Sequence, residues 1–581
     1  MGRFNLLDEP WISVFVKTGE KKEVSMMDFF KESNGFLAMA GEMETQNFAI
    51  LRFLLSVVQT VFSRFDYNGY ELPGVEIDER FRQMVSVDED DLDDYCKATK
   101  ECWNNLYSNG RFPDVLFNYL EKWRDRFYLF DEEHPFYQVN KNEMNLIMGM
   151  TSKNGKPTTI YGKNINRTIS ESENKIALFS PIANKLKMVG NEKRTIKDAM
   201  TEAELARWLI TFQGYSGLAD KVSITLKNQR SSKGWLFDLG GIYILGKSVY
   251  ETIVMNYIPE SPTGNRDFIG RCQRPCWELN GEEVVNRLRQ ECFIDNLAEL
   301  YTNWSRAIYI DPLLETTDLV EIHVVKLPEV EHTERSIEPM TLWKWNESGD
   351  YKNSYTPKKH SPEQSLWRNF GIITMKTSSK GNVKQRQPGI LEQYQWLTES
   401  MGRRYLDIVG ISMQDDSNAT SWLPINEIVD SLRINSLVLN DTELGGWIVN
   451  INDAVETTKE VISVIFRCFL RGICEIRNMC QNDADNFIKI ETGKMYSFID
   501  PYFKEWLSSI EFGDSKDNKI KEWFLNLRKI VLMKGEELFE NSIARDLVGV
   551  ERDGRTENIA TKYWQFVGML NKKINRQGDV S

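Results

Sequence analysis

Residues 433–581 carry the pattern that most restricts what this chain can fold into. Apolar residues recur there every three or four positions, which is the period of an amphipathic helix. Short polar connections separate four such stretches, which lie near residues 452–480, from Asp500 onward, near 516–546 and near 557–574. Four amphipathic helices with short loops predict an antiparallel four-helix bundle.

The predicted inner face of each helix is given by its apolar positions. These are Val461, Ile465, Cys468 and Ile476 in the first helix, Phe503, Trp506 and Ile510 in the second, Ile520, Trp523, Leu527, Ile530 and Phe539 in the third, and Ile559, Tyr563, Phe566, Leu570 and Ile574 in the fourth. The second helix is expected to begin at Asp500-Pro501, because Asp is a good N-cap and Pro suits the first helical position.

Residues 1–432 have a mixed pattern. The stretch "WISVFVKTGEKKEVSM" predicts two strands around a turn at Thr18-Gly19, and a buried helix is expected over residues 47–65. Residues 315–425 are strand-like, with "LVEIHVVKL" and "SYTPKKHSP" among polar turns. The predicted fold class is therefore α+β, with a large mixed α/β domain over residues 1–432 followed by the all-α bundle over 433–581.

Charge is unevenly distributed along the chain. The formal net charge is -13, yet residues 153–197 hold ten Lys or Arg and only three Glu, and "KTSSKGNVKQR" at residues 376–386 has four cations and no acid. An acidic protein is a poor general coat for nucleic acid, because such binding scales with cationic contacts. The two basic segments are therefore interpreted either as specific docking places for an anionic partner or as solvated loops.

Several classes of protein are disfavoured by the sequence. Asp8 and Glu9 stand where a signal peptide needs an apolar run, and the most apolar segment, residues 48–62, contains Arg52 and is too short to span a bilayer. The 8 Cys include no CxxC pair, and only four His could complete a metal site. We expect a cytoplasmic protein without a cofactor or a structural metal.

Residues that could support catalysis are few. No His stands beside Ser or Cys in a nucleophile motif, and His134 in "HPFYQV" precedes a proline in an extended or turn segment. The run "DEDDLDD" at residues 88–94 resembles a metal-binding cluster, but consecutive carboxylates point in different directions on a regular backbone. A solvated loop or helix start is expected there, and a binding protein is favoured over an enzyme.

The segment "FQGYSGLADK" at residues 212–221 follows a predicted helix, "AELARWLIT", at residues 203–211. Gly214 and Gly217 can serve as a helix end and turn, and they also allow backbone N–H groups to approach phosphate or base edges. Their spacing fits neither a phosphate-binding Walker loop nor a dinucleotide fingerprint.

Three motifs occur in an order that resembles one family. "FNLLDEPWISV" at the start, "HPFYQV" after it and then "FQGYSGL", followed by the C-terminal bundle, are similar to the CasA large subunit of the type I-E CRISPR surveillance complex, Cascade. The resemblance implies a non-catalytic, RNA-binding and DNA-binding subunit in antiviral defence. Such a subunit recognises the protospacer-adjacent motif (PAM) in double-stranded DNA, starts unwinding and offers a platform to a separate helicase–nuclease.

The resemblance also implies partners and a guide-RNA site. The partners would be the other Cascade subunits (the backbone, small and guide-processing subunits), the crRNA 5′ handle, the target duplex and the helicase–nuclease. The family's handle-anchoring loop carries an aromatic residue, which falls in "ALFSP" and makes Phe179 the candidate. Its ring could stack on an unpaired base, while the neighbouring cations Lys175, Lys185 and Lys187 would neutralise phosphates.

For DNA, the resemblance implies a glycine loop, a lysine and a hairpin wedge that approach from the minor groove. The glycine loop corresponds to residues 214–219, with Gly214, Ser216 and Gly217 as contact candidates, and the lysine to Lys326 in "EIHVVKLPEV". The wedge aligns with Ser417, Asn418 and Ala419, where Asn replaces the family's usual Gln and Asp415 and Asp416 would repel phosphate. Possible contacts to the DNA backbone are Lys376, Lys380, Lys384 and Arg386.

Two other functions remain open at this point. A metal-dependent nuclease could use the acidic run, with Asp90 and Asp91 as its centre. A scaffold subunit would have the same fold and no contact with nucleic acid. An ordinary polar turn is also an adequate reading of residues 417–419.

Overall fold

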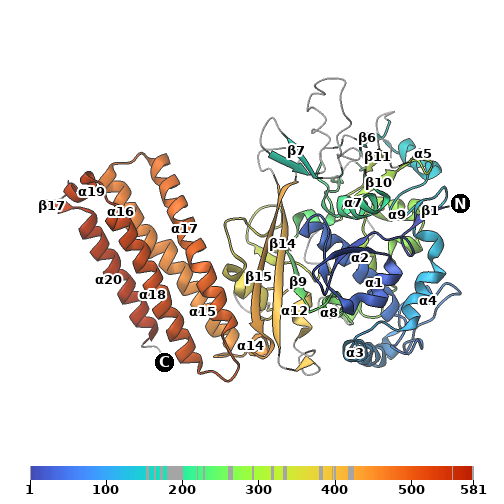
Figure 1. Cartoon of the computed structure of the whole chain (residues 1–581), viewed down its shortest axis with the longest axis horizontal. Helices are drawn as coiled ribbons and strands as arrows, with labels where there is room; N and C mark the ends of the chain where they lie inside the picture. The colour runs from blue at the N-terminus through green and yellow to red at the C-terminus, as the bar shows by residue number, and fades with distance from the viewer. Residues whose placement is uncertain are drawn as a thin grey trace. The chain divides into compact units, whose positions relative to one another are not determined.

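The computed structural model describes most of the chain as two compact units. The described residues are 2–151, 156–161, 165, 167–170, 175–178, 200–218, 220, 222–226, 229–259, 266–290, 293–315, 320–330, 337–378, 384–394, 397, 401–402, 404–415, 424–552 and 554–578. The first unit comprises Met1–His360, Pro388–Gln393 and Val409–Val429, and the second comprises Ser361–Gln387, Tyr394–Ile408 and Asp430–Ser581. The first mixes helices with strands and the second ends in long helices, so the predicted α+β class is confirmed (Figure 1).

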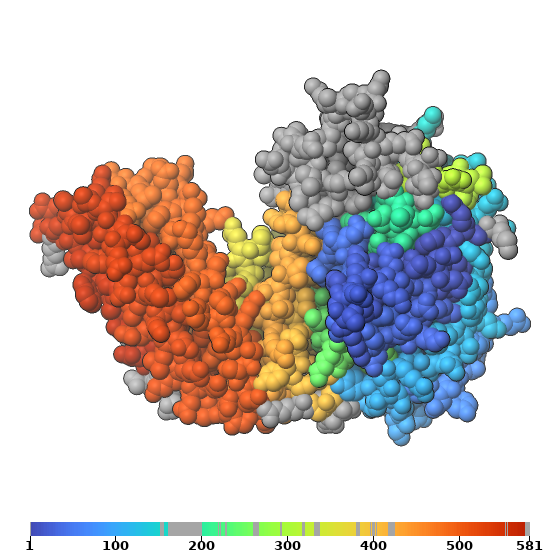
Figure 2. Space-filling model, viewed as in Figure 1, coloured from blue at the N-terminus to red at the C-terminus, as the bar shows by residue number. Residues whose placement is uncertain are grey.

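The first unit begins with a three-stranded antiparallel sheet in the order β3-β2-β4. Strands β2 (Ile12–Val16) and β3 (Lys21–Val24) form the predicted hairpin, and β4 (Phe36–Met39) pairs with the other edge of β2. Gly19 at the turn has φ 85°, a left-handed conformation that glycine adopts without strain. The blue N-terminal segment covers much of the face of this unit seen in Figure 2.

Helix α2 (Glu44–Phe62) forms the centre of the first unit, close to the range 47–65 predicted from its apolar stripe. It is buried on nearly all sides and packs against α7 (Glu202–Tyr215) and α10 (Leu297–Tyr301). A helix buried all round must compensate any charge it carries. Arg52 of α2 does so through a bidentate ion pair with Glu338, in which both N–O distances are 2.7 Å.

A second antiparallel sheet positions the candidate site. Its strand order is β10-β11-β6, with β10 over Arg306–Tyr309, β11 over Glu321–Lys326 and β6 over Thr158–Tyr161. Strand β11 confirms the strand predicted in "LVEIHVVKL", and β6 comes from the basic segment of residues 153–197. Gln213 of α7 bonds to the backbone at Arg306 of β10, so α7 lies beside this strand (Figure 1).

The first unit contains further helices and strands. They are α1 (Met26–Glu32), α3 (Leu92–Asn109), α4 (Asp114–Lys122), α5 (Lys141–Gly149), α8 (Val249–Asn256), α9 (Gly281–Arg289), α12 (Gly389–Glu392) and strands β1 (Arg3–Asn5), β5 (Tyr128–Phe130), β7 (Arg167–Ser170), β8 (Lys175–Leu178), β9 (Gly241–Leu245), β12 (Trp343–Asn346) and β13 (Ser354–Pro357). Strands β14 (Tyr405–Asp415) and β15 (Pro424–Asn435) follow, and each contributes residues to both units.

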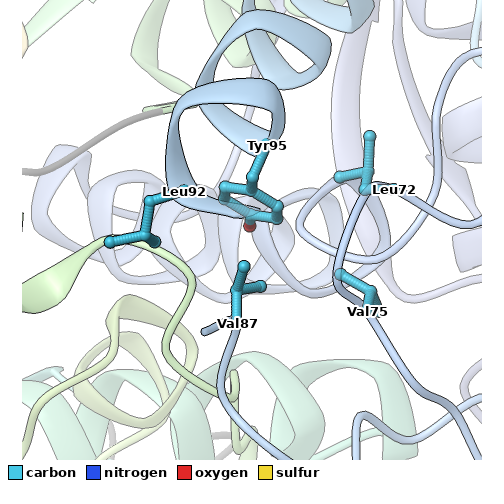
Figure 3. Close-up of a cluster of buried hydrophobic side chains, with 5 residues drawn as sticks. All are labelled: Leu72, Val75, Val87, Leu92 and Tyr95. Atoms are coloured by element: carbon cyan, nitrogen blue, oxygen red, sulfur yellow. The ribbon is translucent and has the colours of Figure 1, made fainter. Parts of the chain in front are cut away.

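The acidic run at residues 88–94 is a helix start. A 3-10 turn over Glu89–Asp91 leads into α3, and all six acidic residues of the run are exposed. Leu92 within the run is buried beside Val87 and Tyr95, in a small apolar cluster that also contains Leu72 and Val75 (Figure 3). The one apolar residue of the run therefore anchors the helix, while its carboxylates point to solvent.

The second unit contains the predicted bundle. Its long helices are α15 (Trp447–Glu460), which continues through a π turn (Val461–Phe466) into α16 (Arg467–Arg477), then α17 (Gln481–Ser508), α18 (Lys516–Glu540) and α20 (Ile559–Gly578). Short elements complete the unit: α11 (Phe370–Thr374), α14 (Ser436–Asn440), α19 (Ala544–Val548), β16 (Val550–Arg552) and β17 (Arg555–Glu557). All five apolar positions predicted for the last helix are buried.

The predicted start of the second bundle helix is wrong. Helix α17 begins at Gln481 and passes through Pro501 in its interior. The Asp500 carboxylate does not cap a helix but accepts hydrogen bonds from Ser365 Oγ and Trp367 Nε1. An Asp-Pro pair favours a helix start when only neighbouring residues are considered. Here the contacts of Asp500 within this unit and the buried positions on both sides of Pro501 favour a continuous helix instead.

Cys468 was also placed wrongly, because it is exposed instead of lying on the inner face. The π turn over Val461–Phe466 precedes it, and a π turn takes up more residues than an α turn. The buried positions after the turn are consequently Phe469, Leu470 and Ile473.

Candidate nucleic-acid interface

The glycine segment, residues 214–218, forms the end of α7 and the turn after it. The Ser216 backbone N–H donates to Phe212 O at 3.0 Å, which closes the last helical turn. Gly234 packs directly on this end, since a Cβ on Gly234 would lie 2.2 Å from Gly214 O. The Gly234 N–H donates to Ser216 O at 2.9 Å. The close approach of the two backbones requires a glycine at position 234.

Burial divides the glycine segment into two parts. Ser216 and Gly217 are buried, and the Ser216 hydroxyl lies 2.9 Å from the hydroxyl of Ser305. Gly214 and Leu218 are half-buried and reach the surface of the unit. Ser216 and Gly217 therefore hold the segment in place. The surface that the segment offers comes from Gly214 and Leu218.

Lys326 lies beside the glycine segment although about a hundred residues separate them in the sequence. It ends β11, and the chain that follows the glycine segment pairs with it: the Lys326 N–H donates to Val222 O at 2.9 Å, and the Ile224 N–H donates to Lys326 O at 3.2 Å. Lys326 is half-buried, and this burial lowers the pKa of its ammonium group. Asp220 opposes that shift, and Arg306 adds to it.

Arg306 joins these elements, although no sequence pattern pointed to it. Its guanidinium is fully buried and donates to the Asp220 carboxylate, to Gly217 O and, at 2.7 Å, to Ser232 O. Arg306 also stands directly opposite Lys326 in the β10–β11 register. A buried Arg with a carboxylate and carbonyl partners has its charge and its donors satisfied.

Gln213 fixes the position of β10 against α7. Its side-chain Oε1 accepts from the backbone N–H groups of Ser305 and Arg306 at 2.9 Å each, and its Nε2 donates to Arg306 O at 2.9 Å. The Gln213 amide thus acts as a hydrogen-bonding partner for the start of this strand. Gln213 lay within the quoted glycine motif, but only the fold reveals its partner.

The basic segment meets the same sheet. Strand β6 pairs with β11 in the register Thr158↔Val324 and Ile160↔Ile322, so residues from the basic segment and Lys326 belong to one sheet. Lys156, just before β6, is exposed. Lys175 begins β8, which pairs with β7, while Phe179, Lys185 and Lys187 lie outside the described residues.

The wedge candidates Ser417, Asn418 and Ala419 also lie outside the described residues. The strands on either side of them, β14 and β15, end at Asp415 and begin at Pro424. The Asp415 carboxylate accepts a hydrogen bond from Lys359 Nζ at 2.9 Å. The charge of Asp415 is therefore balanced by a neighbouring cation, while Asp416, the other carboxylate expected to repel phosphate, lies outside the described residues.

The basic cluster at residues 376–386 belongs to the second unit. Ser378 and Gln385 form an antiparallel bridge, and Lys376 and Lys384 are exposed. Lys376 Nζ lies 3.8 Å from Glu443 Oε1, and Lys380 is outside the described residues. Arg386 is half-buried.

Two features are absent from the described part of the chain. There, no three His, Cys, Asp or Glu residues are grouped so that they could hold a metal ion. No described helix combines the length and the apolar character needed to cross a bilayer.

Comparisons with known proteins point to one family. Residues 5–533 match the family described as CRISPR-associated protein Cse1. The chain is 24% identical over 388 residues to CRISPR-associated protein CasA/Cse1 of Thermus thermophilus, in an alignment that covers 65% of this chain and 61% of that relative.

Solved structures share the fold. The crystal structure of Thermobifida fusca Cse1 superposes with a TM-score of 0.75 at 18% identity, covering 99% of this chain and 98% of that one. A chain of a CRISPR RNA-guided surveillance complex superposes with a TM-score of 0.63 at 12% identity, covering 98% and 100%.

Proposed function

Because the chain belongs to the family of CRISPR-associated protein Cse1, we propose that it is the large subunit of a Cascade surveillance complex and reads a short motif in double-stranded DNA. The relative named CasA/Cse1 and the fold shared with a chain of an RNA-guided surveillance complex support this assembly. In such a complex, base pairing with the guide reads the long target sequence, and the protein reads only the short motif and the backbone.

One observation carries the proposal: the glycine segment and Lys326 converge. The segment follows α7, Lys326 ends β11, and backbone hydrogen bonds join the two regions. A half-buried cation beside a closely packed, side-chain-poor backbone suits the minor groove, whose floor offers acceptors that several base pairs share. The proposed DNA-facing positions are Gly214, Leu218 and Lys326, with Ser216 and Gly217 holding them.

The guide-RNA site is proposed on the basic segment. Phe179 would stack on an unpaired base of the crRNA 5′ handle, and Lys175, Lys185 and Lys187 would neutralise phosphates. The exposed Lys156 and the pairing of β6 with β11 support this, because they place part of the segment on the sheet that carries Lys326.

The remaining roles follow from the same proposal. Ser417, Asn418 and Ala419 would separate the strands of the duplex beyond the motif, and Lys376, Lys380, Lys384 and Arg386 would contact the DNA backbone. The chain would make or break no bond itself and would offer a platform to the helicase–nuclease. We place the complex in the cytoplasm, because the described cysteines form no disulfide with one another.

The test begins with the reconstituted complex of this chain, the other subunits and a guide RNA. A library of duplexes with a randomised flank beside the target identifies the preferred motif. A fluorescent duplex carrying it is then compared with one in which the flank is scrambled. We expect the complex to bind the motif duplex more tightly than the scrambled one. Asn418→Ala should weaken binding of the motif duplex, and Phe179→Ala should release the chain from the complex. Equal affinity for both duplexes would leave only the scaffold function.

The nuclease alternative has its own assay. The purified chain is incubated with DNA or RNA and Mg²⁺ or Mn²⁺, and the double variant Asp90→Asn, Asp91→Asn serves as control. We expect no cleavage by either protein. Cleavage by the unaltered chain that disappears in the variant would replace the present proposal with a metal-dependent nuclease.

A further inference from the structure

Arg306 holds two nearby positions of the chain that follows α7. Its guanidinium donates to Gly217 O and to the Asp220 carboxylate. Further donations go to Ser232 O at 2.7 Å and Ser305 O at 2.9 Å. The side chains of Arg306 and Asp220 are 0% and 4% exposed, so the pair lies beneath the surface of the unit. The planar fork of Arg suits this task, since it aims several donors in fixed directions.

The same guanidinium determines the surroundings of Lys326. The two residues face each other across β10 and β11, and the chain just after Asp220 pairs with the Lys326 backbone. Asp220 carries the negative charge that offsets Arg306, and the same charge opposes the lowering of the Lys326 pKa by burial. Removal of the Asp220 charge would leave the buried Arg306 guanidinium without a counter-charge. The guanidinium would then repel the nearby Lys326 ammonium, because the two charges have the same sign.

We propose that Arg306 and Asp220 are positioning residues for motif reading: the pair holds the backbone at Gly217 and Asp220 in place beside Lys326 and so determines how well the motif is distinguished from other sequences. The inference rests on the proposed function and adds residues that touch no DNA. Its physical basis is preorganisation. A segment already held in one geometry loses little conformational freedom on binding, and its contacts discriminate more sharply between correct and incorrect bases.

A second buried pair in the same unit offers a matched control. Arg64 and Glu278 form a bidentate ion pair at 2.7 and 3.0 Å, and the side chains are 0% and 1% exposed. Tyr119 OH donates to the same carboxylate at 2.5 Å. Glu278→Gln therefore removes a comparable buried charge among residues that make none of the contacts described for the glycine segment or Lys326.

The experiment measures specificity with the reconstituted complex. The variants Asp220→Asn, Arg306→Lys, Lys326→Ala and Glu278→Gln are each titrated with the motif duplex, the scrambled duplex and a single strand complementary to the guide. We expect Asp220→Asn and Arg306→Lys to lower the ratio of motif to scrambled affinity by about tenfold, because a correctly placed base contact provides discrimination of that order. Binding of the single strand, which needs no motif, should stay within about twofold.

The control separates positioning from folding. Glu278→Gln is expected to lower the unfolding midpoint of the chain but to leave the affinity ratio unchanged. An unchanged ratio in both Asp220→Asn and Arg306→Lys, together with a lowered ratio in Lys326→Ala, would overturn the positioning role and leave the proposed function standing. An unchanged ratio in Lys326→Ala as well would remove Lys326 from motif reading, and equal affinity of the unaltered complex for both duplexes would remove the proposed function.

Loss of assembly is also decisive. If Asp220→Asn does not enter the complex, Arg306→Lys, which keeps the charge, gives the answer. If both variants fail to assemble while Glu278→Gln assembles, the pair supports the fold and does not tune recognition, which overturns the proposal.

Discussion

The cores of the two units differ in the kind of contact that stabilises them. In the first unit, α2 is surrounded by side chains that include a buried ion pair, Arg52–Glu338, and Trp235 Nε1 donates to the same carboxylate at 2.6 Å. The long helices of the second unit pack through aromatic rings, as where Trp523 meets Phe503 with ring centroids 4.9 Å apart. Among the described residues, the ion pairs whose two side chains are both at most 4% exposed all lie in the first unit; they are Arg52–Glu338, Arg64–Glu278 and Arg306–Asp220. Fully buried ion pairs therefore distinguish the core of the first unit from the bundle.

The largest expected effect is on the polar core. Glu338→Gln leaves the Arg52 guanidinium buried without a counter-charge, which should lower the free energy of unfolding of the first unit by about 3–5 kcal/mol. Denaturant unfolding of the chain measures this. The exposed Glu347, which follows β12, provides the control, and Glu347→Gln should change stability by less than about 0.5 kcal/mol. A small effect at Glu338 would mean that polar contacts do not stabilise this unit.

The same substitution carries a pH signature. Burial raises the pKa of Glu338, because it opposes ionisation of the carboxyl group. The positive charge of Arg52 and the hydrogen bonds from Arg52, Trp235 and the Met340 backbone outweigh burial and lower this pKa below the ordinary 4.5. A depressed carboxyl pKa contributes stability that is complete above the unfolded value and is lost as the pH falls through the folded one. The stability difference between wild type and Glu338→Gln should therefore narrow below about pH 4.5. A difference independent of pH would contradict the ion-pair account.

A glycine substitution in the first unit should have an intermediate effect. Gly234 has φ -55° and ψ 144°, which alanine adopts without strain, so Gly234→Ala tests only the 2.2 Å approach to Gly214 O. The end of α7 must shift, at a cost of about 1–3 kcal/mol. We expect a lower unfolding midpoint and weaker preference for the motif duplex. Wild-type motif preference in this variant would show that the position of the glycine segment is unimportant.

The matching substitution in the bundle should be mildly stabilising. A Cβ on Gly493 in α17 meets nothing within 4 Å. Because alanine is the better helix former, Gly493→Ala should raise the free energy of unfolding by about 0.5–1 kcal/mol. Denaturant unfolding of the second unit checks this, and a clear loss of stability would reveal a constraint on α17 that the packing does not indicate.

The bundle was the most predictable part of the chain, because the burial of a helix face repeats within a few residues. All the positions predicted for the last helix proved buried, and the hairpin at Thr18-Gly19 has the predicted turn. The Cys468 error arose from the π turn that interrupts the helical period, whereas the Asp500 error arose from contacts away from the local helix. Asp500 accepts from Ser365 and Trp367 more than a hundred residues away instead of capping a helix.

The candidate site was only partly predictable for the same reason. Gly214, Gly217 and Lys326 carried a family resemblance, so they could be named from the sequence. Arg306 and Asp220 could not, because 86 residues separate them and an isolated Arg or Asp carries no pattern. The burial of Ser216 could not be predicted either, because its hydroxyl contacts that of Ser305, 89 residues away in the sequence.

The central claim is that Lys326 and the adjacent glycine segment read a DNA motif. The most direct test is the affinity of the reconstituted complex for motif and scrambled duplexes with Lys326→Ala. Lys344→Ala, which removes an exposed cation of β12 in the same unit, serves as the matched control. The account predicts that Lys326→Ala lowers motif preference by about tenfold or more and that Lys344→Ala retains it. Equal motif preference in wild type and Lys326→Ala would contradict the account.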